Sequence, residues 1–348
     1  MAKLVIFFCY NSITMSEFTG NSISNRSLDM LVGEYDTSEM TVKNVNGGYS
    51  RNRRAIVSLG ESEVFLKEVD TDILPDDGDV ELGWLKKEHN VIEAVRPFVP
   101  SLLPEWSKLT MDGHLLIMPS YSTEDGWLWT PPEGTIARAA YVDRIVRATR
   151  ELEEVQLPGS LTNSLSLQPY FRDKLANDDS IDRILSDSQL RSRLIEKYSS
   201  LLHEAGDEHL LNAYSLLINA LKDDAMLEEL NEKTRQLARQ PNDCFNHCDV
   251  RSDNITYHPA TDEVKFVDWN WASYAPSKFG STEFLADMAR RGVDITPWTS
   301  DLNSELLAAM VGLYIVKSLN EPLSPTSTLR QMQAETGAVS FQLYTLVR

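Results

Sequence analysis

The strongest constraint on the fold of this chain is a change in its hydrophobic pattern near Ser120. Before that residue, short apolar runs alternate as in strands and are separated by tight turns; after it, apolar residues recur every three or four positions over long segments, as in helices. The expected strands of the first part cover 40–45, 54–58, 63–69 and 114–118, with one helix over 83–95 before the last of them.

This change predicts an α+β protein of two lobes. We expect a tail over 1–29, because 11–29 is rich in Ser, Thr and Asn and has no periodicity. A small lobe with an antiparallel sheet follows over 30–119, and a large, mostly helical lobe occupies 120–348. Residues 68–81 between the third strand and the helix are strongly acidic and predict a solvated loop.

The charge of the chain excludes some partners. Its 348 residues include 33 Lys and Arg against 52 Asp and Glu, a net charge of −19. A surface of this sign repels nucleic-acid phosphates and anionic lipid, so we expect neither as a partner. The charge either aids solubility or attracts a cationic ligand, and both interpretations stay open.

Cysteine usage predicts a reducing compartment. The three cysteines, Cys9, Cys244 and Cys248, form no even disulfide framework, and the apolar stretch 4–10 is too short to span a membrane, so we expect a cytoplasmic protein. Cys244, Cys248 and the nearby His247 fit no common zinc spacing, and a structural packing role is favoured for both thiols.

One stretch of the helical part carries chemistry. His247, Asp249 and Asn254 form the pattern H-x-D-x-x-x-x-N, and a hairpin of two short strands then leads to Asp268. This layout is typical of phosphoryl transfer, in which one Asp orients the acceptor hydroxyl and takes its proton, while Asn and Asp oxygens bind Mg²⁺. Asp and Asn also occur in turns for local hydrogen bonding, which is the alternative.

Two residues of the first part strengthen the interpretation. Lys67 shares a strand face with Phe65, where a lysine needs a partner, and Glu88 follows in the next helix. A strand lysine paired with a helix glutamate positions nucleotide phosphates in kinase-like folds. The turn at 47–50 is a candidate phosphate-covering loop, although a plain hairpin turn is the alternative.

From Met40 onward the sequence resembles the aminoglycoside phosphotransferase and choline kinase-like family, which has a protein-kinase-like fold. The resemblance rests on the residues above, on the D-W step at Asp268-Trp269 and on the segment Phe284-Leu-Ala-Asp287-Met-Ala289. Three features depart from the family pattern: Cys248 stands where many members have Gly, Asn270 where many have an acid, and the chain between Asp268 and Asp287 is longer than usual.

The resemblance implies a kinase that transfers the γ-phosphoryl group of ATP or GTP, with Mg²⁺, to a hydroxyl of a small acceptor such as an aminoglycoside, amino alcohol or sugar, and that acts as a monomer or homodimer. A pseudokinase that binds nucleotide and acts as a regulator is the alternative. The expected catalytic residues are Asp249 and Arg251, and the metal ligands are Asn254 and Asp268. The expected nucleotide contacts are Gly47, Gly48, Tyr49, Ser50, Lys67, Glu88, Met118 and Ser120, and the expected substrate contacts are Trp271, Tyr274 and Asp287.

Overall fold

The computed structural model describes residues 22–34, 40–45, 52–60, 62–69, 75–165, 167, 180–322 and 327–348. The chain divides into two compact units. The first comprises Met1–Arg144, Gln156–Ser166 and Asp253–Trp271, and the second comprises Ile145–Val155, Leu167–Ser252 and Ala272–Arg348.

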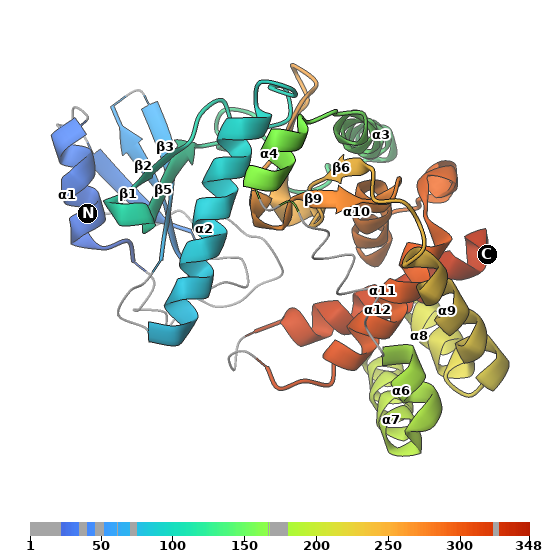
Figure 1. Ribbon diagram of the computed structural model, residues 1–348. Coiled ribbons are helices and arrows are strands. Elements are labelled where there is room, and N and C mark those ends of the chain that lie inside the picture. The colour runs from blue at the N-terminus through green and yellow to red at the C-terminus, as the bar shows by residue number, and fades with distance from the viewer. Residues whose placement is uncertain are drawn as a thin grey trace. The chain divides into compact units, whose positions relative to one another are not determined.

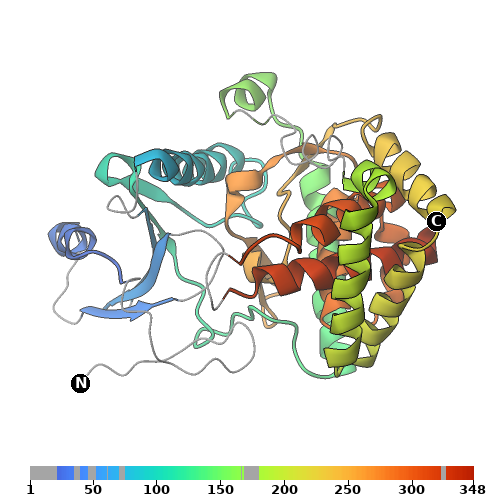
Figure 2. The same cartoon turned by 90° about the horizontal axis from the view of Figure 1, so that it is seen from below.

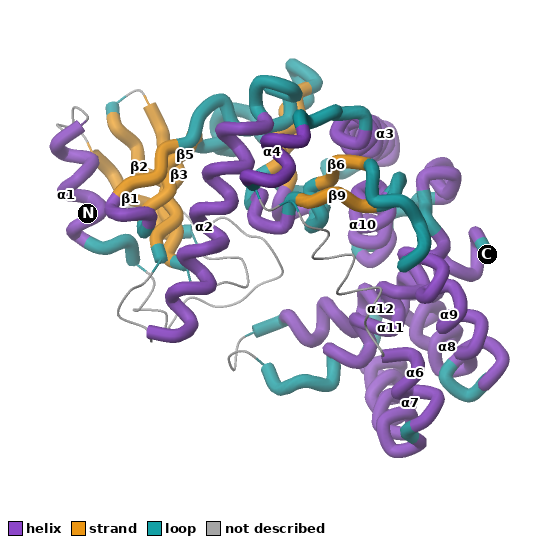
Figure 3. Tube along the Cα trace, viewed as in Figure 1, coloured by secondary structure: helices purple, strands orange, loops and turns teal. Residues whose placement is uncertain are grey.

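The first unit contains an antiparallel sheet, in which β1, β2, β3 and β5 are labelled in Figures 1 and 3. Its five strands follow the order β1-β2-β3-β5-β4. Four of these strands occur where the sequence predicts them. The fifth, β4, was not predicted because three residues carry too little alternation to identify a strand. The strands are β1 (Met40–Asn44), β2 (Arg53–Leu59), β3 (Ser62–Glu68), β4 (Lys108–Thr110) and β5 (Leu115–Pro119).

One face of this sheet is covered by helix α1 (Asn25–Glu34), whose Leu31 packs in one core with Leu66 and Ile117. Helix α1 begins at Asn25, so the last five residues of the expected tail over 1–29 are helical. The helix is attached by Glu68, whose carboxylate accepts hydrogen bonds from Ser24 N at 2.8 Å and from Ser27 Oγ at 2.8 Å. These contacts are long-range in sequence, which is why local periodicity did not reveal them.

The opposite face carries Lys67 and is contacted by helix α2 (Pro75–Val95) through Glu88. The helix begins eight residues before the predicted Gly83, so the expected acidic loop over 68–81 is helical from Pro75 onward. Proline suits the first helical position, because its missing N–H would have no intrahelical partner there.

The first unit also contains the hairpin of β7 (Ile255–His258) and β8 (Glu263–Phe266), which the sequence predicts. Leu102 O accepts a hydrogen bond from Phe266 N at 2.9 Å, so the hairpin is attached to the segment that follows α2. Short helical segments complete the described part: η1 (Met111–Gly113), α4 (Gly159–Ser164), η2 (Ser252–Asn254) and η3 (Trp269–Trp271).

The second unit is mostly helical (Figures 2 and 3). Helix α11 (Ser304–Lys317) packs against several other helices and is buried on nearly all sides. Gly337 of α12 (Leu329–Val347) allows a close approach to α11, because a Cβ there would lie 2.6 Å from Ile315 Cγ2. None of the described helices combines the length and hydrophobicity of a membrane-spanning segment. The elements are α3 (Thr135–Glu153), which begins in the first unit, α6 (Ser180–Ser186), α7 (Ser188–Glu204), α8 (Glu208–Ala220), α9 (Asp224–Leu237), β6 (Cys244–Asn246), β9 (Ser273–Ala275), α10 (Phe279–Arg290), η4 (Thr296–Asp301), α11 (Ser304–Lys317) and α12 (Leu329–Val347).

Candidate active site

Three predicted residues of the first unit, Lys67, Glu88 and Asp268, form a closed set of charges, in which each residue is hydrogen-bonded to the other two. Lys67 Nζ lies 2.7 Å from Glu88 Oε2 and 2.7 Å from Asp268 Oδ1. Glu88 also accepts a hydrogen bond from Asp268 N at 3.0 Å through its other oxygen. Strand β3, helix α2 and the end of the β7–β8 hairpin each contribute one member, so elements far apart in sequence meet at one cation.

Burial and neighbouring charges together set the pKa values of Lys67 and Glu88. The exposed fractions of Lys67 and Glu88 are 3% and 1%. Burial alone lowers the pKa of Lys67, but the adjacent Asp268 and Glu88 carboxylates outweigh it and raise that pKa above its usual value. Burial raises the pKa of Glu88, while the Lys67 ammonium and the Asp268 N–H oppose that rise. Lys67 therefore stays a cation, as a phosphate ligand must.

Asn254 lies beside Asp268 at the base of the hairpin. Val267 N donates to Asn254 O at 2.9 Å, which brings the backbones of these two predicted metal ligands together. Asn254 is buried, and Asp268 holds a left-handed backbone with φ of 65°. An amide oxygen and a carboxylate are the hard donors that Mg²⁺ prefers, so the side chains present fit that ion, with its other ligands left to phosphate and water.

Arg54 is a further cation on this face of the sheet, and it was not predicted as a site residue. It pairs with Lys67 across β2 and β3, so both side chains lie on the same face. Burial lowers the pKa of Arg54, whereas the carboxylates of Asp268 and Glu88 raise it. The tight turn after Leu59 could have revealed Arg54, because it sets a register in which Arg54 stands opposite Lys67.

The predicted nucleotide contacts on β5 are also on this face. Met118 pairs with Phe65, two residues before Lys67 on β3, and is buried. Ser120 follows it, and its N–H donates to Glu63 O at 3.4 Å. In the described part of the chain the buried Ser120 Oγ has no hydrogen-bond partner. The predicted loop residues Gly47, Gly48, Tyr49 and Ser50 lie outside the described residues.

The second unit contains the predicted base and its neighbour. Asp249 Oδ1 lies 3.4 Å from Arg251 Nε, and both side chains are 22% exposed. Arg251 N also donates to Asp249 O at 3.0 Å, which closes a turn around Val250. Cys248 has a left-handed backbone with φ of 59°. This conformation explains why a glycine is suited to the position where the sequence has Cys248.

Helix α10 contacts the loop through two buried acids one turn apart. Glu283 Oε2 accepts a hydrogen bond from Val250 N at 3.1 Å. Asp287 Oδ2 accepts two bonds from Ser252, from N at 3.1 Å and from Oγ at 2.6 Å. Asp287 was predicted to contact substrate, and the structure instead buries it among this loop and two arginines.

The electrostatics of the two acids differ. Burial would raise the pKa of Asp287, but Arg290 at 2.6 Å and Arg291 at 3.2 Å hold it far below the usual range. Burial and the charge of Asp249 raise the pKa of Glu283 to about 8. Glu283 was missed by sequence reasoning, although its position one helical turn before Asp287 was a usable signal.

The two aromatic residues predicted as substrate walls lie in different units. In the first unit, Trp271 of η3 packs against Trp84 of α2, with ring centroids 5.8 Å apart. In the second unit, Tyr274 of β9 packs edge-on against Phe245 of β6, with centroids 6.2 Å apart. Trp271 and Tyr274 are both half-buried.

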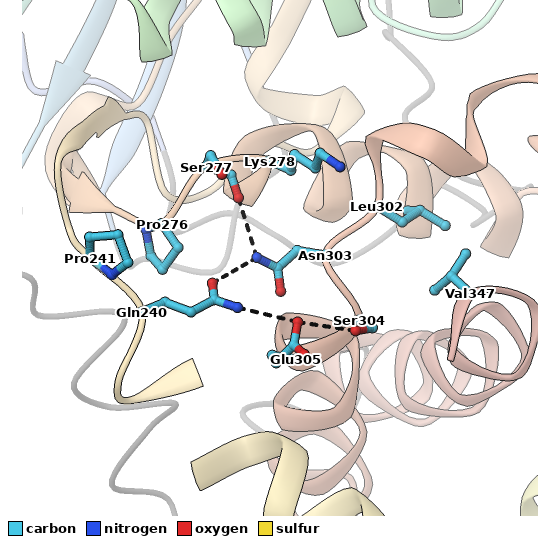
Figure 4. Close-up of a pocket in the computed structure, with 10 residues that line it drawn as sticks. All are labelled: Gln240, Pro241, Pro276, Ser277, Lys278, Leu302, Asn303, Ser304, Glu305 and Val347. Carbon is cyan, nitrogen blue, oxygen red and sulfur yellow. Dashed lines mark hydrogen bonds between the residues drawn. The ribbon is translucent and has the colours of Figure 1, made fainter. Parts of the chain in front are cut away.

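A pocket of about 290 Å³ in the second unit contains none of the predicted site residues (Figure 4). Its polar side chains bond to one another: Asn303 Nδ2 donates to Gln240 Oε1 at 2.9 Å, and Gln240 Nε2 donates to Glu305 Oε2 at 3.2 Å. A ligand there would have to replace existing hydrogen bonds, so the pocket is a poor candidate for the active site.

The fold is similar to that of two solved phosphotransferases. One is spectinomycin phosphotransferase APH(9)-Ia in complex with ADP and spectinomycin, with a TM-score of 0.53 and 12% identity over 93% of this chain and 98% of that chain. The other is choline kinase LicA from Streptococcus pneumoniae, with a TM-score of 0.50 and 12% identity over 91% of this chain and 100% of that chain. No protein-family model matches the chain, and no curated protein is similar to it in sequence.

At these identities the similarity shows the fold. It confirms the predicted kinase-like fold, in which an antiparallel-sheet N-terminal part precedes a mostly helical C-terminal part.

Proposed function

We propose that this protein is a small-molecule kinase that transfers the γ-phosphoryl group of ATP or GTP to a hydroxyl of a small acceptor. The observation that carries the proposal is the closed set of Lys67, Glu88 and Asp268, with Asn254 beside it. A buried lysine held by two carboxylates, next to an amide oxygen, matches what Mg-nucleotide binding requires.

Each residue has a distinct role in this proposal. Lys67 binds the α- and β-phosphates and is oriented by Glu88. Asn254 and Asp268 would hold Mg²⁺, which would neutralise phosphate charge. Asp249 orients the acceptor hydroxyl and takes its proton, while the acceptor oxygen bonds to the γ-phosphorus and the bond to the β–γ bridging oxygen breaks. Arg251, which lies 3.4 Å from Asp249, offsets charge on the transferred group.

The proposed acceptor is a small cationic alcohol, such as an amino alcohol or an aminoglycoside. The net charge of −19 favours a cation, and half-buried rings such as Trp271 are suited to bind one. The similar structures are named for spectinomycin and choline, both of which are amines or ammonium compounds, in keeping with this class.

The test has two steps. Thermal denaturation with and without Mg-ATP or Mg-GTP checks nucleotide binding, which we expect to raise the melting temperature. Nucleotide consumption is then measured across a panel of amino alcohols, aminoglycosides and neutral sugars. Absence of both stabilisation and consumption would refute the proposal.

The alternative is a pseudokinase that binds nucleotide without transferring phosphate. The Asp249→Asn variant separates the two functions. A kinase loses turnover in this variant and keeps its stabilisation by Mg-nucleotide, whereas nucleotide consumption that survives the substitution would contradict the assigned role of Asp249.

A further inference from the structure

We infer that Glu283 is a positioning residue that fixes the backbone immediately after Asp249 by accepting the Val250 N–H. The inference rests on the proposed function, since it concerns the residue that acts as base there. The hydrogen bond is 3.1 Å long and buried, and the exposed fraction of Glu283 is 7%. A carboxyl group in such a place has no solvent to replace the bond, so the loop is held at this point.

The contacts of Glu283 differ from those of its neighbour Asp287. Asp287 is paired with Arg290 and Arg291 and holds Ser252, so its charge is neutralised by its own helix. In the part of the chain that the structure describes, Glu283 forms no ion pair with a lysine or arginine, and Val250 is its hydrogen-bond donor. The two acids thus hold Val250 and Ser252, on either side of Arg251, and among the described residues only Asp287 forms ion pairs.

The groups around Glu283 favour its neutral form. Burial disfavours the charged form of Glu283, and the Asp249 carboxylate disfavours a second negative charge beside it. The Val250 N–H and the Arg251 guanidinium oppose these two effects only in part, so the pKa of Glu283 is raised to about 8. Tyr314 of α11 also belongs to this cluster, because the charges of Glu283, Asp249 and Asp287 act on its phenol. An ionised Glu283 would place a second negative charge beside the Asp249 carboxylate, and the two would repel each other.

The experiment compares Glu283→Gln and Glu283→Ala with the wild-type chain over a pH range that brackets about 8. Glutamine keeps an oxygen for the Val250 N–H and cannot ionise. We expect kcat of the wild type to decline as the pH rises past about 8. We expect Glu283→Gln to keep kcat at neutral pH and to lose that decline. Alanine removes the acceptor, and we expect kcat to fall by roughly 10- to 100-fold, with the KM for nucleotide unchanged.

Glu153 supplies a matched control. It is another carboxyl group with a pKa raised by burial, it faces the backbone N–H groups of Lys278 and Phe279 at the start of α10, and the shift of its pKa does not involve Asp249. Glu153→Gln should leave the pH profile of kcat as in the wild type. An unchanged alkaline decline in Glu283→Gln, or a wild-type kcat in Glu283→Ala, would overturn the inference.

A readout independent of turnover separates this inference from the proposed function. The folded chain retains the Glu283 proton that the unfolded chain releases at the ordinary carboxyl pKa, so stability falls as pH rises from there to about 8. We expect Glu283→Gln to abolish that part of the fall in melting temperature. If the wild type consumes no nucleotide with any acceptor, the proposed function fails; if the two melting profiles coincide, the inference about Glu283 fails.

Discussion

Removal of the Lys67 charge tests whether the buried charge set is both structural and functional. In Lys67→Met, Glu88 keeps its burial but loses its cation, and Asp268 loses a partner at 2.7 Å. Breaking a buried ion pair from one side costs about 3–5 kcal/mol, because the remaining charge is left uncompensated. In a unit of this size each kcal/mol lowers the melting temperature by about 2–4 °C, so we expect a loss of about 6–20 °C.

The double variant Lys67→Met/Glu88→Gln completes the cycle. It removes both buried charges, and such replacements are often close to neutral in stability. We expect it to recover most of the lost stability in urea and thermal denaturation, with a coupling energy of about 2 kcal/mol or more. Glu88→Gln alone leaves Lys67 bonded to Asp268 and should cost less than Lys67→Met.

Nucleotide binding distinguishes the two roles of Lys67. The double variant restores the fold without restoring the ammonium group, so stabilisation by Mg-nucleotide should stay weak in it, as in Lys67→Met. The reasoning is refuted if Lys67→Met is as stable as the wild type, or if the double variant is less stable than Lys67→Met. Wild-type nucleotide affinity in the double variant would refute the phosphate-binding role.

Three further predictions test separate parts of the molecule. Asp249→Asn should lower kcat by roughly 10²- to 10⁴-fold while stabilisation by Mg-nucleotide is unchanged, measured by steady-state kinetics and thermal denaturation. Arg54→Met should weaken Mg-nucleotide binding by roughly 10- to 100-fold in calorimetry, since a hydrogen bond to a charged group contributes about 1.5–3 kcal/mol; an unchanged affinity would exclude Arg54 from the site. Ser27→Ala, which removes a 2.8 Å bond to buried Glu68, should cost about 1–2 kcal/mol in urea denaturation, whereas Ser22→Ala, at an exposed bond, should cost little.

Local patterns were sufficient for the strands and helices that carry the site. Alternation along β3 placed Lys67 on a face where it needs a partner, and the helical spacing after Gly83 placed Glu88 in α2. Both inferences depend on periods of two and 3.6 residues, which a single segment contains. In the structure Lys67 is paired with Glu88, and Asp268 is a second partner of the same ammonium group.

Features that depend on contacts between distant segments were not accessible in this way. The first half of helix α1 was expected to belong to a tail, because the attachment of the helix depends on Glu68, more than forty residues away. Arg54 became a member of the charge set only through its register opposite Lys67.

The sequence by itself determined the chemistry available to this protein: a buried lysine with a helix glutamate, a catalytic-loop pattern with Asp249 and Asn254, and an aspartate after a hairpin. Those assignments follow from residue type and short spacing. Tertiary structure alone decided the environment of each acid. Asp287 and Glu283 lie one turn apart on α10, yet two arginines keep the first charged, whereas burial beside Asp249 favours a proton on the second. Solvation and neighbouring charge set a pKa, and both are properties of the folded chain.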